Sequence, residues 1–215
     1  MLYQFVYHIF APFMVLPFFR LFNRLEVSGV EHIPPSGPAV VIANHISSWD
    51  PALLYGLIRR KSYFMAKQEL FDRPILGFIL KRICAFPVKR ETVDRTALRK
   101  AAQVLEEGHL LVIFPEGHRS ETGEMQAFKQ GAALFAHRSK AAVIPVLLEN
   151  TRNAFPKSIG QKVKVVFGQS LDLTAFYGAK ADSALLGEMT DTFKQGILRL
   201  ASVREASLPV DANRM

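Results

Sequence analysis

The chain carries, at residues 38–51, the stretch PAVVIANHISSWDP, in which a short apolar run passes directly into a polar turn. Residues 38–43 are apolar, rich in β-branched side chains and preceded by a Ser-Gly pair, a pattern that predicts a buried strand. Ser47, followed three residues later by Asp50, has the spacing of a capping box. This spacing predicts a helix from Pro51 to Arg60 with Ser47 as its N-cap.

The segments on either side repeat this alternation of strand and helix. We expect further strands at 25–30, 63–66, 85–88, 109–114, 142–148 and 163–167, and helices at 75–83, 92–107, 127–138 and 181–203. The strand at 25–30 is expected at a sheet edge, and the helix at 92–107 is expected to be capped by Thr92. With 215 residues, the chain is long enough for one domain with a full core. The order of elements predicts an α/β fold with a mixed, largely parallel sheet covered by helices.

The N-terminus differs in composition from the rest of the chain. Residues 1–19 contain no charged side chain, six of the 17 phenylalanines lie within the first 22 residues, and Arg20 and Arg24 follow. Two prolines interrupt a segment that is otherwise close to the ~20 residues of a membrane-spanning helix. We interpret residues 1–24 as a membrane-associating helical segment that lies in one leaflet, with a helix of the domain's core as the alternative. The rest of the chain is expected to divide into one domain at 25–203 and a flexible tail at 204–215.

Charge and cysteine content limit the classes of partner. The formal net charge of +8 favours anions, which include nucleic acid, an anionic membrane face and a phosphorylated substrate. The basic residues are dispersed without a nucleic-acid-binding motif, so no nucleic acid is expected as a partner. Cys84 is the only cysteine, and the six histidines include no helix-spaced pair, so neither a disulfide nor a metal site is expected.

His45 and Asp50 lie five residues apart, directly after the predicted strand. In the first turn of a helix, the Asp50 carboxylate can bind one imidazole nitrogen and leave the other free to take a proton. The pair therefore predicts a general base with its orienting partner. The alternative is that Asp50 only caps the helix and His45 packs beside it.

Other polar residues also follow predicted strands. Lys67, Arg90 and residues 116–119 each come directly after an apolar run. Ligands of α/β proteins bind beyond the carboxyl ends of the strands, where parallel strands bring such residues to one edge. We therefore expect these residues to lie around the same site as His45.

Four separated blocks carry most of these residues: NHISSWD at 44–50, AFPVKR at 85–90, FPEGHRS at 114–120 and VIPV at 143–146. Two shorter blocks, AKQEL at 66–70 and FKQGA at 128–132, lie between them. In this order the blocks resemble the glycerolipid acyltransferases, and most of all the 1-acylglycerol-3-phosphate acyltransferases. Two positions depart from that pattern, since Cys84 stands where the family has glycine and His118 where it has threonine.

The resemblance implies transfer of a fatty acyl group from acyl-CoA or acyl carrier protein to the free hydroxyl of 1-acylglycerol-3-phosphate. His45 would act as the base and Asp50 would orient it, without a covalent acyl-enzyme and without a cofactor. Two alternatives stay open. The acceptor could be another lysolipid, such as a different lysophospholipid or a lyso-ornithine lipid, or the chain could be a non-catalytic basic protein of the membrane surface.

The same resemblance assigns substrate-binding roles. Arg90 and Arg119 would bind the acceptor phosphate, because a guanidinium matches two phosphate oxygens, and Lys67 would add charge. Glu116 would hold the glycerol group or order the basic side chains, and Gly117 would permit close approach of a substrate. The expected location is a membrane surface with the active site facing the cytoplasm, and the expected partners are the lysophospholipid, the acyl donor and membrane lipid.

Overall fold

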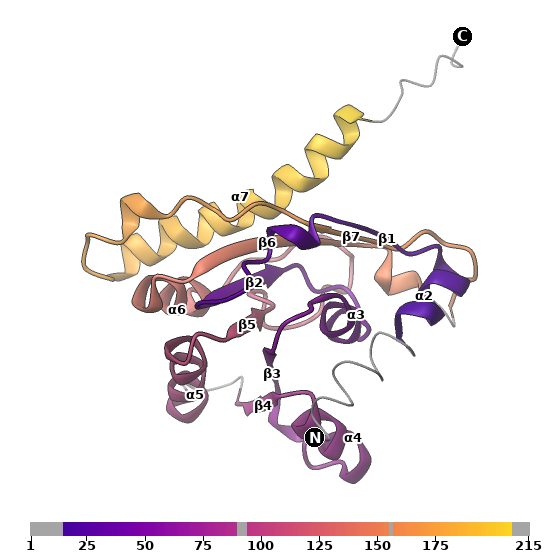
Figure 1. The fold of residues 1–215 in the computed structure, drawn as a ribbon, viewed down its shortest axis with the longest axis horizontal. Helices are drawn as coiled ribbons and strands as arrows, with labels where there is room; N and C mark the ends of the chain where they lie inside the picture. Colours follow the sequence, from indigo (N-terminus) through magenta and orange to yellow (C-terminus); the bar gives the residue numbers. More distant parts are fainter. Residues whose placement is uncertain (1–14, 90–93, 155–156, 208–215) are drawn as a thin grey trace.

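The computed structural model describes residues 15–89, 94–154 and 157–207 (Figure 1). Arg90, Thr92, residues 1–14 of the predicted N-terminal segment and residues 208–215 of the predicted tail lie outside the described residues. The described chain forms a seven-stranded sheet with helices on both faces. This arrangement confirms the predicted α/β fold.

The sheet is mixed, with most of its strands parallel. Its strands are β1 (Glu26–Ser28), β2 (Ala39–Ala43), β3 (Ser62–Lys67), β4 (Ala85–Val88), β5 (Leu110–Ile113), β6 (Ala142–Glu149) and β7 (Lys164–Phe167). They are ordered β1-β7-β6-β2-β5-β3-β4. Strands β2 to β6 run parallel to one another, whereas β7 is antiparallel to β6 and parallel to β1. The carboxyl ends of β2, β3, β4, β5 and β6 therefore meet at one edge.

Burial of each strand follows from its place in the sheet. All five residues of β2 are buried, because β2 lies between β5 and β6 and helices cover both faces. A continuous apolar run is typical of such a strand. The predicted edge position of the first strand is confirmed, since β1 is the outermost strand and none of its three residues is fully buried.

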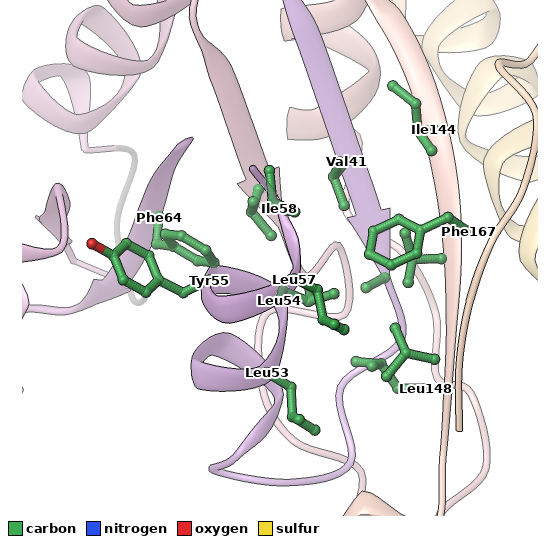
Figure 2. Packing of buried hydrophobic residues seen from close by; sticks show 14 of the residues in the cluster. Val41, Leu53, Leu54, Tyr55, Leu57, Ile58, Phe64, Ile144, Leu148 and Phe167 are labelled. Atoms are coloured by element: carbon green, nitrogen blue, oxygen red, sulfur yellow. The ribbon is translucent and has the colours of Figure 1, made fainter. Parts of the chain in front are cut away.

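Two sets of helices cover the two faces of the sheet. The helices are α2 (Leu16–Asn23), α3 (Asp50–Leu57), α4 (Pro74–Arg82), α5 (Arg95–Glu106), α6 (Gly131–Ser139) and α7 (Ser183–Ser207). Apolar residues of α2 and α3 form one core cluster with the sheet, and α4 packs against its border, while α5, α6 and α7 supply the other cluster (Figure 1). Figure 2 shows the first cluster, in which apolar side chains of α3, such as Leu53 and Leu57, lie on the same side of the sheet as Phe167.

Several predicted helix boundaries are wrong, for reasons that lie in local hydrogen bonds. Helix α5 begins at Arg95 rather than near Thr92, because the Asp94 carboxylate accepts the backbone N–H groups of Thr96 and Ala97, both at 3.0 Å. Asp94 itself is extended, with ψ 92°, so the chain is not helical at that residue. An aspartate at this position is a preferred N-cap.

Helix α3 is shorter than predicted and ends at Leu57 rather than Arg60. The guanidinium of Arg60 donates to the carbonyl oxygens of Pro34, Gly37 and Gly108 at 2.7–2.8 Å. These bonds hold Arg60 across two loops, so the chain leaves the helical path after Leu57. Helix α7, in contrast, continues to Ser207, past the predicted domain end at residue 203.

The described part of the predicted N-terminal segment is helical and packs on the domain. Leu16 and Phe19 of α2 are buried in the first core cluster, and the rings of Phe18 and Phe19 lie 5.9 and 5.5 Å from that of Trp49. Among residues 15–89, 94–154 and 157–207, no helix combines the length and apolar composition needed to cross a bilayer. The membrane association of residues 1–24 stays a prediction.

Candidate active site

His45 and Asp50 meet at the carboxyl end of β2. His45 follows the strand by two residues, and Asp50 is the first residue of α3. The imidazole Nδ1 lies 2.9 Å from Asp50 Oδ2, with the Asp50 side chain fully buried and that of His45 10% exposed. Because a carboxylate only accepts hydrogen bonds, Nδ1 is the donor, and in the neutral ring Nε2 then presents a lone pair. No group within the described residues hydrogen-bonds Nε2.

The Asp50 carboxylate is held by three further donors. Oδ2 also accepts the backbone N–H groups of Ile46 at 2.8 Å and Ser47 at 2.7 Å. Oδ1 accepts the hydroxyl of Thr151 at 2.5 Å. Four donors around a buried carboxylate offset the cost of removing its charge from water and fix its orientation toward His45.

The predicted capping box is only half correct. Ser47 Oγ accepts the N–H of Trp49 at 3.2 Å and Asp50 accepts that of Ser47, so the two side chains do exchange hydrogen bonds with the backbone. However, Trp49 is the N-cap, because Ser47 to Asp50 first form a turn closed by a 3.3 Å bond from Asp50 N to Ser47 O. Asp50 therefore accepts hydrogen bonds from the turn and from His45 at once. The general-base role of the pair stays a prediction.

His45 is fixed through its backbone and its ring by the loop after β5. Its N–H donates to Glu116 Oε1 at 2.7 Å, its carbonyl accepts Ser120 N at 2.8 Å, and its ring stacks on Phe114 with 4.2 Å between centroids. Glu116 is 1% exposed, and its second oxygen accepts the N–H of Gln126 at 2.9 Å. Glu116 thus connects its own loop after β5 to the backbone of His45 and to that of Gln126. The contact of Glu116 with the glycerol group stays a prediction.

Two polar residues of the site were given no role by sequence reasoning. The Asn44 amide donates to the carbonyl of Leu148 at 2.9 Å and accepts its N–H at 2.8 Å, which continues the β2–β6 pairing through a side chain. Thr151 follows β6 by two residues and lies against Asp50. The position of Thr151 just past a predicted strand was the available signal, the same one that selected Lys67 and Glu116.

The predicted phosphate-binding residues divide into three cases. Arg119 is exposed, and its Nη1 donates to Ser48 Oγ at 2.5 Å, which places the guanidinium beside the His45–Asp50 turn. Lys67 is the last residue of β3, at the same edge of the sheet, and pairs with Glu69 at 3.0 Å. Arg90 lies outside the described residues. Its neighbour Lys89 is the last residue of the described range 15–89 and directly follows β4.

Gly117 has a backbone conformation that suits glycine. Its φ is +78°, and a β-carbon at this position would lie 2.9 Å from Cε of Lys129. Lys129 is held there because its N–H donates to the carbonyl of Pro115 at 2.8 Å. This bond, with that of Gln126 to Glu116, keeps the chain before Gly131 in a loop, so the predicted helix start at residue 127 is wrong. Approach of a substrate to Gly117 stays a prediction.

The two departures from the family pattern have local structural explanations. Cys84 has φ +57°, the left-handed region that glycine adopts without steric cost, so this position keeps the backbone of a glycine turn. The ring of His118 donates Nδ1–H to the carbonyl of Glu116 at 3.0 Å and is exposed.

No cluster of three histidine, cysteine, aspartate or glutamate side chains suited to a metal ion occurs in the part of the chain that the structure describes. The polar groups around His45 form a hydrogen-bonded pair of histidine and carboxylate beside an exposed guanidinium. Such a set suits removal of a proton from a bound hydroxyl next to an anionic group.

Comparison with known proteins identifies the family. The family model described as Acyltransferase matches residues 24–149, more than half of the chain. A 1-acyl-sn-glycerol-3-phosphate acyltransferase of Borreliella burgdorferi is 31% identical over 63% of this chain, and the chloroplastic enzyme LPAT1 of Arabidopsis thaliana is 32% identical over 72%. The chain spans 55% and 43% of the lengths of these two proteins. A Bacillus subtilis enzyme of the same name is 29% identical over 82% of this chain and 87% of its own length.

A solved structure is similar over nearly the whole chain. The 1-acyl-sn-glycerophosphate (LPA) acyltransferase PlsC of Thermotoga maritima matches 97% of this chain and 83% of its own, with a TM-score of 0.75 and 25% identity. The fold, the order of the four blocks and the family model lead to the same assignment. The chain belongs to the acyltransferase family.

Proposed function

We propose that this protein transfers a fatty acyl group to the free hydroxyl of 1-acylglycerol-3-phosphate and so forms phosphatidic acid. The observation that carries this proposal is the His45–Asp50 pair, whose Nε2 has no protein partner in the described residues, next to the exposed Arg119. The relatives named as 1-acyl-sn-glycerol-3-phosphate acyltransferases support the choice of acceptor.

The geometry suggests how the proton moves. His45 Nε2 takes the proton of the acceptor hydroxyl as its oxygen attacks the thioester carbonyl. Asp50, bound to Nδ1–H, stabilises the imidazolium that forms. Collapse of the tetrahedral intermediate breaks the carbon–sulfur bond, and the thiolate leaves and takes the proton from His45. Direct transfer needs no covalent acyl-enzyme, because a thiolate is a good leaving group once both substrates are held in line.

Arg119 is proposed to bind the acceptor phosphate. It reaches Ser48, three residues from His45, so a phosphate on its guanidinium would hold the glycerol hydroxyl near the imidazole. Lys67 is the last residue of β3, and Arg90 comes two residues after the neighbouring strand β4 in the sequence, so both would add positive charge at this edge. The donor is proposed to be acyl-CoA or acyl carrier protein, and no cofactor takes part in the reaction.

The protein is proposed to work at a membrane surface, with its active site facing the cytoplasm. An uncharged, phenylalanine-rich segment at residues 1–19, followed by arginines, supports an interfacial position. The acceptor is itself a lipid, so a site at the membrane surface would meet it without extracting it into water.

Release of free CoA from acyl-CoA in the presence of lysophosphatidic acid tests the mechanism. His45→Ala should abolish the release, and Asp50→Asn should lower kcat strongly, with melting temperatures close to that of the unaltered protein. His109→Ala is the matched control, because His109 precedes β5 and so lies at the opposite edge of the sheet. Full activity of His45→Ala would refute the proposed base.

The choice of acceptor has its own test. Arg119→Ala should raise KM for lysophosphatidic acid by about a hundredfold, the loss of a bidentate ionic contact of roughly 3 kcal/mol. The same change should leave KM unaltered for an acceptor without a phosphate. An unchanged KM for lysophosphatidic acid would instead favour a different lysolipid head group.

A further inference from the structure

The outer side of α4 presents three large apolar side chains to solvent. Ile75, Phe78 and Ile79 are 79%, 57% and 44% exposed. Their spacing of three and four residues places them on one side of the helix. On the inner side, Gly77 is buried and Leu80 packs against the first core cluster. Helix α4 therefore has apolar residues both on the side that packs against the protein and on the side that is exposed to solvent.

The orientation of α4 is fixed by close packing at Gly77. A β-carbon there would lie 2.3 Å from the carbonyl oxygen of Phe71, so only glycine permits this contact. Pro74 occupies the first turn, where its lack of an N–H has no cost. Because the inner side is held in this way, the three apolar side chains keep facing outward.

Positive charge borders this apolar surface. Arg73 precedes the helix, Lys81 and Arg82 form its last turn, and none of its nine residues is acidic. The guanidinium of Arg82 lies 3.9 Å from the ring centroid of Phe78. Apolar side chains flanked by cations match the interface of an anionic bilayer, where the former enter the acyl region and the latter meet lipid phosphates.

The surface also lies on the side of the protein that the substrate would use. Within the described residues, five of the seven exposed large apolar side chains belong to α2, to α4 or to Trp49 at the start of α3. Helices α2, α3 and α4 share one face of the sheet (Figure 1). The chain passes from Lys67, at the carboxyl edge of β3, through residues 68–73 into α4, so α4 begins on the side of the sheet where the strands have their carboxyl ends.

We propose that α4 lies in the interface of an anionic membrane, with Ile75, Phe78 and Ile79 inserted among the lipids. This surface acts in addition to residues 1–24, and it rests on the proposed function, since it gives the site access to a lipid acceptor. Insertion of α4 holds the carboxyl edge of the sheet against the bilayer, so that the acceptor reaches His45 without leaving the lipid phase.

Fluorescence quenching tests the insertion directly. Trp49 is the only tryptophan, so the full chain with Trp49→Phe and Phe78→Trp reports from α4 alone. Vesicles of phosphatidylcholine and phosphatidylglycerol that contain brominated phosphatidylcholine should quench this reporter. The matched control is Leu198→Trp in the same background, because Leu198 is 40% exposed on α7, which covers the other face. Absence of quenching at position 78, or equal quenching at both positions, overturns the proposal.

A second experiment compares binding with catalysis. The variant Ile75→Ser/Phe78→Ser/Ile79→Ser should lower partition into these vesicles by about a hundredfold, from the apolar area of three side chains that is no longer inserted. Activity on a short-chain lysophosphatidic acid present as monomers should not change. The control variant Leu198→Ser should partition as the unaltered protein does. Unchanged partition of the triple variant refutes the proposal, whatever its melting temperature.

These outcomes are separable from failure of the proposed function. An unaltered protein that binds vesicles through α4 but transfers no acyl group to any lysophosphatidic acid would refute the activity and leave the membrane contact standing. An unaltered protein that is active on the monomeric acceptor, with no quenching at position 78, would refute only the contact.

Discussion

Replacing Thr151 by valine removes one hydroxyl at the active site and keeps the volume of the side chain. Thr151 is fully buried, and its hydroxyl donates to Asp50 Oδ1 at 2.5 Å. The other donors to this carboxylate, His45 Nδ1 and two backbone N–H groups, all bind Oδ2. Valine therefore leaves Oδ1 without a donor in the described residues, while the contact between Asp50 and His45 is retained.

A hydrogen bond to a charged group contributes about 1.5–3 kcal/mol, so Thr151→Val should lower the free energy of unfolding by that amount. Asp50 then keeps its position, but its carboxylate loses the hydrogen bond at Oδ1, which together with the hydrogen bonds at Oδ2 fixes the rotation of the carboxylate. We expect kcat to fall by about tenfold, which corresponds to roughly 1.4 kcal/mol of lost transition-state stabilisation. KM for the acceptor should stay the same, because Thr151 contacts Asp50 and not Arg119.

The assay is release of free CoA over a range of acceptor concentrations, together with unfolding in urea. Thr151→Ser keeps the hydroxyl and should restore kcat, although loss of the buried methyl group lowers stability by about 1 kcal/mol. A merely structural role would lower stability in both variants without separating their kcat values. Equal kcat values for valine, serine and threonine at this position would refute the reasoning.

Three further changes test other contacts. Asn44→Ala should lower the free energy of unfolding by about 2–4 kcal/mol, because two buried backbone groups of β6 lose their partner; a loss below about 1 kcal/mol in urea would contradict this. Gly117→Ala should destabilise the protein more than Gly123→Ala, since both have positive φ, +78° and +92°, and only at residue 117 would the methyl group meet another side chain. Equal decreases in the free energy of unfolding for the two variants would show that backbone strain alone destabilises them. Hydrogen bonds from the backbone of Ala97 and other residues lower the pKa of Asp94. Its stabilising effect relative to Asp94→Asn should therefore be present above pH about 4 and be lost as the pH falls through the lowered pKa, which melting temperatures at several pH values would show.

The elements themselves were largely predictable from local pattern. The apolar runs at 38–43 and 142–148 correspond to β2 and β6, and the amphipathic pattern after residue 92 corresponds to α5. Burial selects these patterns wherever a strand or helix meets the core, so they can be read without knowing the fold. Boundaries were less predictable, because contacts such as those of Arg60 with three loop carbonyls decide where a helix ends.

The candidate site was predictable where its parts are close in sequence. His45 and Asp50 are five residues apart, and their contact follows from a strand that leads into a helix. The predicted roles of Lys67, Arg90, Glu116, Gly117 and Arg119 in substrate binding await experiment. The structure adds contacts for Glu116 that the sequence did not indicate, since its oxygens bind the backbone of His45 and Gln126.

The sequence by itself determined the α/β class, the order of the elements, the histidine and carboxylate at the end of β2, and the resemblance to the acyltransferases. The class, the elements and the pair depend on apolar periodicity and short spacings, which act within one segment, whereas the resemblance depends on four short blocks in order. Only the tertiary structure decided which distant groups hold that pair. Thr151 is 101 residues from Asp50, and Leu148 is 104 residues from Asn44. Parallel pairing of β2 with β6 and β5 brings their carboxyl ends together, and no local pattern encodes which side chains then meet there.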